Sequence, residues 1–155
     1  VNMSHLGLLL LFPIDSEYEY IVNKHFDILY YKKIEITIEH FQQLFRIDCR
    51  HEERIIISRS EENFGDGKLI FFLFRANSVV DVNENLKKKA RREIDNMRYI
   101  KTGIDRKSLP LQNHLHTTDN SDQLIKSVNY LKRINKIDNS EHKQILSYIN
   151  KSNYN

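Results

Sequence analysis

The chain has 155 residues, of which 40% are hydrophobic and 29% are charged, and its formal net charge at pH 7 is +3. This is the composition of an ordinary globular domain, which excludes a disordered chain, and the apolar run 6–14 is too short to cross a bilayer. Cys49 is the only cysteine, which excludes an internal disulfide and favours a cytoplasmic setting. We expect one domain over residues 1–155, and the start at Val1 suggests a piece of a longer protein.

The first third of the chain alternates strand and helix patterns. Pro13 ends an apolar run that reads as a buried strand, and Ser16 and Glu19 then form a capping-box pattern that predicts a helix start. Isoleucines at every second position predict another strand, and apolar residues at helical spacing follow it. The predicted elements are a strand at 5–12, a helix at 16–29, a strand at 30–38 and a helix at 39–48.

The middle of the chain carries two more strand patterns, at 54–58 and 68–74, on either side of the turn-rich segment 63–67. We interpret this arrangement as a hairpin. The elements expected after it are a helix from Asn77 or Ser78 to Met97, a loop at 98–112, a short strand at 113–116, a helix capped by Asp119 and a last helix opened by Ser140.

This order predicts an α+β fold: a ferredoxin-like βαββαβ antiparallel sheet with helices packed on it and an extra C-terminal helix. A doubly wound parallel sheet is disfavoured, because the crossovers are few and the strands before Phe74 read as a hairpin.

The candidate site lies between the last predicted strand and the helix that follows it. The segment there reads Asn-His-Leu-His-Thr-Thr-Asp from Asn113 to Asp119. A helix start offers free backbone N–H groups and a positive dipole end to a phosphate. A neutral imidazole at His116 can act as a nucleophile or base near pH 7.

These residues and the element order together resemble the nucleoside diphosphate kinase family. In that family a strand leads into Asn-x-x-His-Gly-Ser-Asp, and the matching residues here are Asn113, His116 and Asp119. The family ends its first strand in Lys-Pro-Asp, where this chain has Phe-Pro-Ile-Asp from position 12. Arg106 lies upstream of the histidine, where the family has a phosphate-binding arginine. The resemblance covers residues 5–133 as an order of elements.

The resemblance implies a nucleotide-binding domain that takes a nucleoside di- or triphosphate together with Mg²⁺, and that forms homo-oligomers. In the family's ping-pong reaction, His116 would attack the γ-phosphate of the triphosphate, hold it as phosphohistidine and pass it to a diphosphate. Arg106, Lys107 and Asn113 would bind the phosphates and ribose. No metal ligand is implied in the protein itself.

Three positions depart from the family's pattern. Phe12 replaces the strand-1 lysine, Thr117 replaces the glycine after the histidine, and Ser127 stands near the position of the glutamate that orients the imidazole. Phosphoryl transfer depends on positioned positive charge. The lysine could be replaced by Arg106, Lys107, Arg91 or Arg92 only if the fold brings one of them there. An active transferase and a degenerate, inactive domain therefore both stay open.

Two alternatives of other classes remain. The segment 86–107 carries nine Lys and Arg against three acidic residues, which suits a non-catalytic nucleic-acid-binding or interaction module; sheet-exposed Tyr30 and Tyr31 would then stack bases. The second alternative is a metal site. On a strand, His114 and His116 would face the same side, and Asp119 could complete the ligand set.

Overall fold

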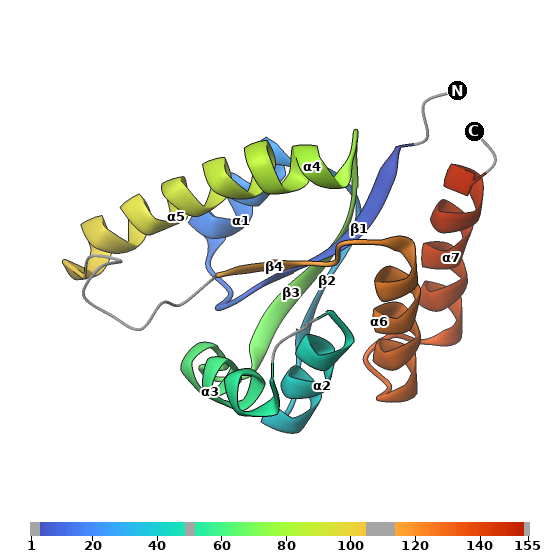
Figure 1. Cartoon of the computed structure of the whole chain (residues 1–155), viewed down its shortest axis with the longest axis horizontal. Helices are drawn as coiled ribbons and strands as arrows, with labels where there is room; N and C mark the ends of the chain where they lie inside the picture. Colours follow the sequence, from blue (N-terminus) through green and yellow to red (C-terminus); the bar gives the residue numbers. More distant parts are fainter. Residues whose placement is uncertain (1–3, 49–51, 105–113, 154–155) are drawn as a thin grey trace.

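The computed structural model describes residues 4–48, 52–104 and 114–153 (Figure 1). Its sheet has four strands in the order β2-β3-β1-β4, and every neighbouring pair is antiparallel. This is the strand order and direction of the ferredoxin-like fold, so the predicted fold class is confirmed. The strands are β1 (His5–Leu11), β2 (Asp27–Glu35), β3 (Lys68–Ala76) and β4 (Leu115–Thr117).

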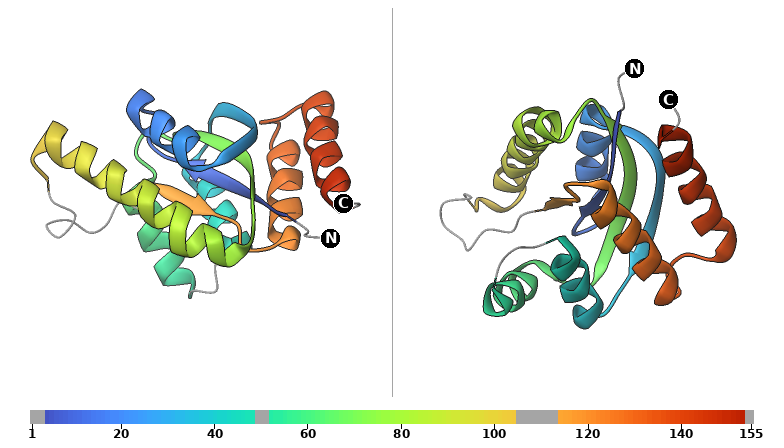
Figure 2. Two further views of the ribbon diagram at one scale, coloured as in Figure 1. Left: turned by 90° about the horizontal axis from the view of Figure 1, so that it is seen from above. Right: turned by 45° about the vertical axis from the view of Figure 1, so that its right-hand side comes forward.

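Helices cover both faces of this sheet (Figures 1 and 2). One face is covered by α1 and α5, and the other by α2, α6 and α7, with α3 packed against α2. The helical segments are α1 (Ser16–His25), α2 (Ile38–Asp48), α3 (Glu53–Asn63), α4 (Val79–Asp81), the π-helical turn η1 (Val82–Leu86), α5 (Lys87–Thr102), α6 (Ser121–Arg133) and α7 (Asn139–Asn153).

The two central strands are apolar on both faces, which places them between two hydrophobic cores. In β1, Leu8 and Leu10 join the core under α2 and α6, whereas Leu9 joins the core under α1 and α5. In β3, Phe71 lies in the first core and Phe72 in the second, and both rings are almost fully buried. Alternation along a strand explains this division between the two cores.

Because helices cover both faces of the sheet, Tyr30 and Tyr31 of β2 have little room to stack on bases. The hydroxyl of Tyr30 donates to Oε2 of Glu141 across 2.6 Å, which ties this side chain to α7. Tyr31 stays 60% exposed and stacks on Phe72. The sheet therefore offers no open face on which Tyr30 and Tyr31 could stack bases together.

The predicted strand at 54–58 is wrong, because this segment belongs to α3. Ile56, Ser60 and Asn63 recur at helical spacing and are buried, while Ile57 is 37% exposed. Burial of one helical face outweighs the strand preference of three consecutive isoleucines. The neighbours of β3 in the sheet are β1 and β2, so the predicted hairpin between 54–58 and 68–74 is wrong as well.

The first helix is shorter than predicted and is capped by another residue. Asp15, not Ser16, is the N-cap, since its Oδ1 accepts from the N–H groups of Glu17 and Tyr18 at 2.9 and 3.2 Å. The helix ends at His25, and Leu29 lies in β2 on the opposite face from α1. The strand predicted at 30–38 therefore starts too late and ends too late, because β2 spans 27–35.

Ser78 caps the following helical segment as predicted, because its Oγ accepts from the N–H of Asp81 at 3.0 Å. The segment continues through η1 and α5 to Thr102, where the sequence predicted a loop from 98 onward. Gly103, with φ of +70°, ends α5 in a left-handed conformation that glycine adopts easily.

Two other predicted caps are wrong by one or two positions. Asn120, not Asp119, caps α6, and its Oδ1 accepts from the N–H of Gln123 at 2.9 Å. Asp138 and Glu141 bond each other's backbone N–H groups reciprocally at the start of α7, where Ser140 was expected to open the helix. Within the described ranges, every helix is too short or too polar to span a membrane.

Candidate functional site

His116 lies on β4, the edge strand next to β1, directly opposite Leu10. The register places its side chain on the face covered by α2 and α6. The half-buried imidazole meets the ring of Phe45 edge to face, with centroids 4.8 Å apart and an interplanar angle of 88°. The partner that the fold brings to the candidate nucleophile from α2 is therefore an aromatic ring.

Phe45 belongs to an aromatic cluster that includes the residue in place of the family's lysine. Phe12 follows β1 directly and is only 3% exposed. Its ring packs on those of Phe41 and Phe45, with centroid distances of 5.2 and 6.4 Å. Phe41 and Phe45 are themselves 4.7 Å apart. An apolar wall thus stands on this side of His116, at the position where the resemblance requires a cation.

The residues after His116 fasten β4 to β1. Thr118 donates its N–H to the carbonyl of Leu8 at 3.0 Å, and its Oγ1 accepts from the N–H of Leu8 at 2.9 Å. Thr117 and Ser127 are both buried, with side chains at most 3% exposed. The two threonines at the family's Gly-Ser positions are therefore structural here.

The start of α6 is already hydrogen-bonded by its own side chains. Asn120 accepts from the N–H of Gln123, and the N–H of Asp119 donates to Oε1 of Gln123 at 2.7 Å. Two of the backbone donors around this helix start are thus satisfied internally. Fewer donors remain for a phosphate than the sequence suggested.

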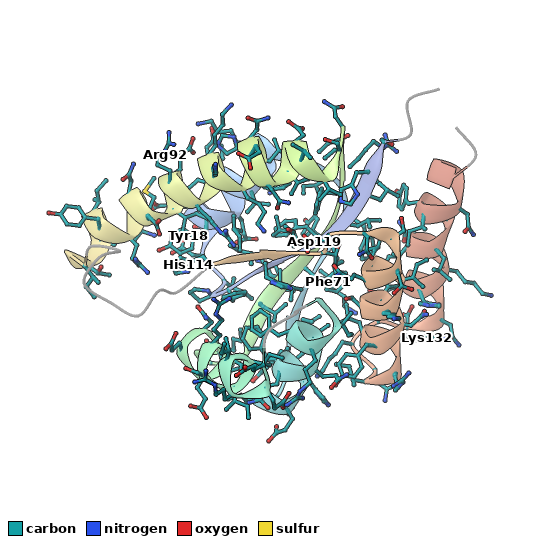
Figure 3. All side chains as sticks on the ribbon, in the orientation of Figure 1. Tyr18, Phe71, Arg92, His114, Asp119 and Lys132 are labelled. Atoms are coloured by element: carbon teal, nitrogen blue, oxygen red, sulfur yellow. The ribbon has the colours of Figure 1, made fainter. Side chains whose placement is uncertain are left out.

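His114 occupies a separate, buried environment (Figure 3). Its Nδ1–H donates to the carbonyl of Phe12 at 3.0 Å, and Nη1–H of Arg98 donates to its Nε2 at 3.3 Å. Its ring also packs 5.3 Å from that of Tyr18 on α1. Burial lowers the pKa of His114 below its ordinary 6.5, so the neutral imidazole is favoured.

His114 and His116 therefore contact helices on opposite faces, α5 and α1 for the first and α2 for the second. The prediction that they share a face is wrong, because His114 precedes β4 and strand alternation does not extend to it. Within the described ranges, no group of three His, Cys, Asp or Glu side chains could hold a metal ion. The alternative of a metal site at His114, His116 and Asp119 is thus overturned.

The structure describes only some of the residues expected to support His116. Arg106, Lys107 and Asn113 lie outside the described residues. Arg91 donates from Nη2 to the carbonyl of Leu115 at 2.6 Å, from the α5 face of the sheet. Arg92 lies on the exposed side of α5 (Figure 3). Neither arginine takes the place of the lysine beside Phe45.

Sequence reasoning missed Arg98 and Phe45 as neighbours of the two histidines. Arg98 follows Ala90 and Ile94 at intervals of four, which puts it on the buried side of α5. That spacing was a usable signal. Phe45 carried no such signal, since only the packing of α2 against β4 brings it to His116.

Comparisons with known proteins support the fold. The structure is similar to the nucleoside diphosphate kinase of Aquifex aeolicus, with a TM-score of 0.55 and 14% sequence identity over 89% of this chain and 98% of that chain. The sequence matches no protein-family model and no curated protein. At this identity the likeness establishes a shared, nucleoside diphosphate kinase-like fold.

Proposed function

We propose that this chain is a nucleotide-binding domain with a nucleoside diphosphate kinase-like fold in which phosphoryl transfer through His116 has been lost. The observation that carries the proposed loss is the buried ring of Phe12, packed against Phe45 where the resemblance calls for a lysine. Transfer of a phosphoryl group relies on cations that stabilise its spreading negative charge. An aromatic wall beside the imidazole supplies none.

Nucleotide binding is supported by the fold and by the surroundings of His116. The partly buried ring of Phe45 offers an aromatic surface against which a base could pack. Arg106, Lys107 and Asn113 are the proposed contacts to phosphate and ribose, from the segment just before His114. Mg²⁺ would arrive as part of the substrate, bound to the phosphates.

Two measurements on the purified protein test the two halves of this proposal. Isothermal titration with Mg·ADP tests binding, and we expect Arg106→Gln and Lys107→Gln to weaken it while Lys132→Gln on α6 leaves it unchanged. Absence of binding by the wild type at millimolar Mg·ADP would refute a nucleotide site.

Incubation with γ-labelled ATP and Mg²⁺ tests the loss of transfer, and we expect no protein-bound label. An acid-labile, alkali-stable label that disappears in His116→Ala and persists in His142→Ala would show that transfer survives. His142 is a suitable control because it lies on α7 and bonds Asn129, away from β4.

A further inference from the structure

The side of α5 that faces away from the sheet presents cations and an aromatic ring in one line. This helix contains seven Lys and Arg against two acidic residues, Glu93 and Asp95. Four exposed residues follow one another along this helix at intervals of three or four: Lys88, Arg92, Asn96 and Tyr99. We call them the outer face of α5. Figure 3 shows Arg92 pointing away from the molecule.

The two acidic residues of α5 each contact a cation that is not part of the outer face. Glu93 accepts from Lys24 at 3.1 Å and contacts His25 at 2.9 Å, both on α1. Asp95 lies 3.9 Å from the buried Arg98. Lys88 pairs with Glu84 at 3.0 Å, but both side chains are more than 60% exposed and such a pair is easily exchanged.

An open depression runs beside this face, lined by Lys88, Arg91, Arg92, Asp95 and Asn96. Arg91 is held in place there by its bond to the carbonyl of Leu115. A guanidinium fork, a second arginine and an amide are groups that bind phosphate oxygens. Three cationic side chains, Lys88, Arg91 and Arg92, line the depression against the one carboxylate of Asp95, so the excess of positive charge suits an anionic ligand.

We propose that the outer face of α5 binds the sugar–phosphate backbone of a single-stranded nucleic acid, with Tyr99 stacking on one base. Lys88 and Arg92 are about 6 Å apart along the helix axis and Tyr99 lies about 10 Å further, which gives a track of a few nucleotides. Tyr99 is 57% exposed, and only unpaired bases offer their faces to such a ring.

A membrane surface does not suit this helix. A helix binds a bilayer interface through a free apolar face along its length. In α5, Ala90 and Ile94 are fully buried against the sheet, and the exposed apolar residues Tyr99 and Ile100 lie only near its C-terminal end. The proposal is also independent of the nucleotide site. His116 contacts α2 on the other face of the sheet, so either proposal can fail without the other.

Fluorescence anisotropy with a labelled dT oligonucleotide, titrated at increasing salt, tests this interface. We expect the double variant Lys88→Gln/Arg92→Gln to weaken binding about tenfold or more, and to reduce the slope of log K against log salt by about 1.4 for two lost phosphate contacts. Tyr99→Ala should weaken binding about tenfold through the lost stacking.

The matched control is Lys126→Gln/Lys132→Gln on α6, on another side of the molecule (Figure 3). It removes the same charge, and Lys126 pairs with Asp122 at i,i+4 as Lys88 does with Glu84. Equal weakening by both doubles would overturn the proposal, since only net charge would then matter. So would tighter binding of polyglutamate or of anionic vesicles than of the oligonucleotide, or no oligonucleotide binding at low salt.

Discussion

Arg98 of α5 donates from Nη1 to Nε2 of His114 at 3.3 Å, and both residues are at most 5% exposed. The contact fixes the tautomer of His114, because Nε2 accepts while Nδ1–H donates to the carbonyl of Phe12. Asp95 and Asp15 lie near enough to act on the imidazole, yet burial and the arginine oppose its protonation. The residue next to β4 is therefore a neutral structural link between α5 and the end of β1.

This link predicts that the protein loses stability as the pH falls. The pKa of His114 is below 6.5 in the folded protein, so the unfolded chain takes up its proton first and stability declines as the pH drops through 6.5. We expect His114 to titrate below 6.5 by NMR. In urea unfolding, His114→Gln should lose less stability than the wild type between about pH 7.5 and about pH 5.5. A titration of His114 at or above 6.5 would contradict the prediction.

The ion-paired Glu141 predicts a second, more acidic transition. Lys32 donates to Oε1 at 2.8 Å and Tyr30 to Oε2 at 2.6 Å, and these bonds lower the pKa of Glu141 to about 2. A lowered pKa stabilises the fold above the ordinary 4.5, and this contribution is lost as the pH falls toward about 2.

Glu141→Gln should therefore destabilise the protein near neutral pH by about 1–3 kcal/mol, the usual range for hydrogen bonds to a charged group. The control Glu62→Gln, an exposed site on α3, should change the free energy of unfolding by less than about 0.5 kcal/mol. Equal effects of the two variants in urea unfolding would show that the link between β2 and α7 is not stabilising.

Phe12→Lys should destabilise the fold and not simply restore the family's residue. The ring is 3% exposed among Phe41 and Phe45, so a lysine there would bury an unpaired charge, at about 3 kcal/mol or more. Phe12→Leu keeps an apolar side chain and should cost about 1.5 kcal/mol. If urea unfolding finds Phe12→Lys as stable as Phe12→Leu, the aromatic rings around position 12 can move apart and admit a lysine, which would contradict the prediction.

The cap of α1 predicts unequal effects of two adjacent substitutions. Asp15→Ala removes the acceptor for two backbone N–H groups and the partner of Lys101 at 2.8 Å, so it should cost about 1 kcal/mol. Ser16→Ala should be close to neutral, because Ser16 already lies inside the helix. Thermal unfolding of both variants checks this, and a larger loss for Ser16→Ala would restore the capping box that the sequence suggested.

Gly7→Ala should destabilise the protein by overpacking the core. A Cβ at position 7 would lie 2.5 Å from Cζ and 2.9 Å from Cε1 of Phe74 on the paired strand. We expect a loss of about 1–3 kcal/mol. Phe74→Leu shortens the opposing side chain, so the double variant should lose less than the sum of the single ones. Additive losses in urea unfolding would rule out this steric cause.

The ferredoxin-like order could be predicted because the central strands carry a strong local signal. The runs 5–11 and 68–76 are apolar on both faces, and only a sheet covered on both sides buries such segments. The strand prediction for segment 54–58 failed because its three isoleucines suit a strand locally, while α3, which packs on α2, buries Ile56 and leaves Ile57 partly exposed. Tertiary packing decides between two structures of similar local preference.

The site could be predicted only in part. The motif led to His116, and the position of Phe12 at the end of β1 could be read directly. Its contact with Phe45 could not, since the two residues come from segments more than 30 positions apart. The opposite environments of His114 and His116 could not be predicted either, because β4 begins at Leu115, two residues later than the predicted strand at 113–116.

The sequence alone thus determined what local chemistry can encode: which strands are buried, that Pro13 ends the first strand, and which helix carries the excess of cations. Only the tertiary structure decided which side chains meet. It placed Phe45 on His116 and Arg98 on His114, and it turned Arg92 outward. The physical reason is that a side chain's charge and its role depend on neighbours from distant segments, whose approach is set by the packing of whole elements.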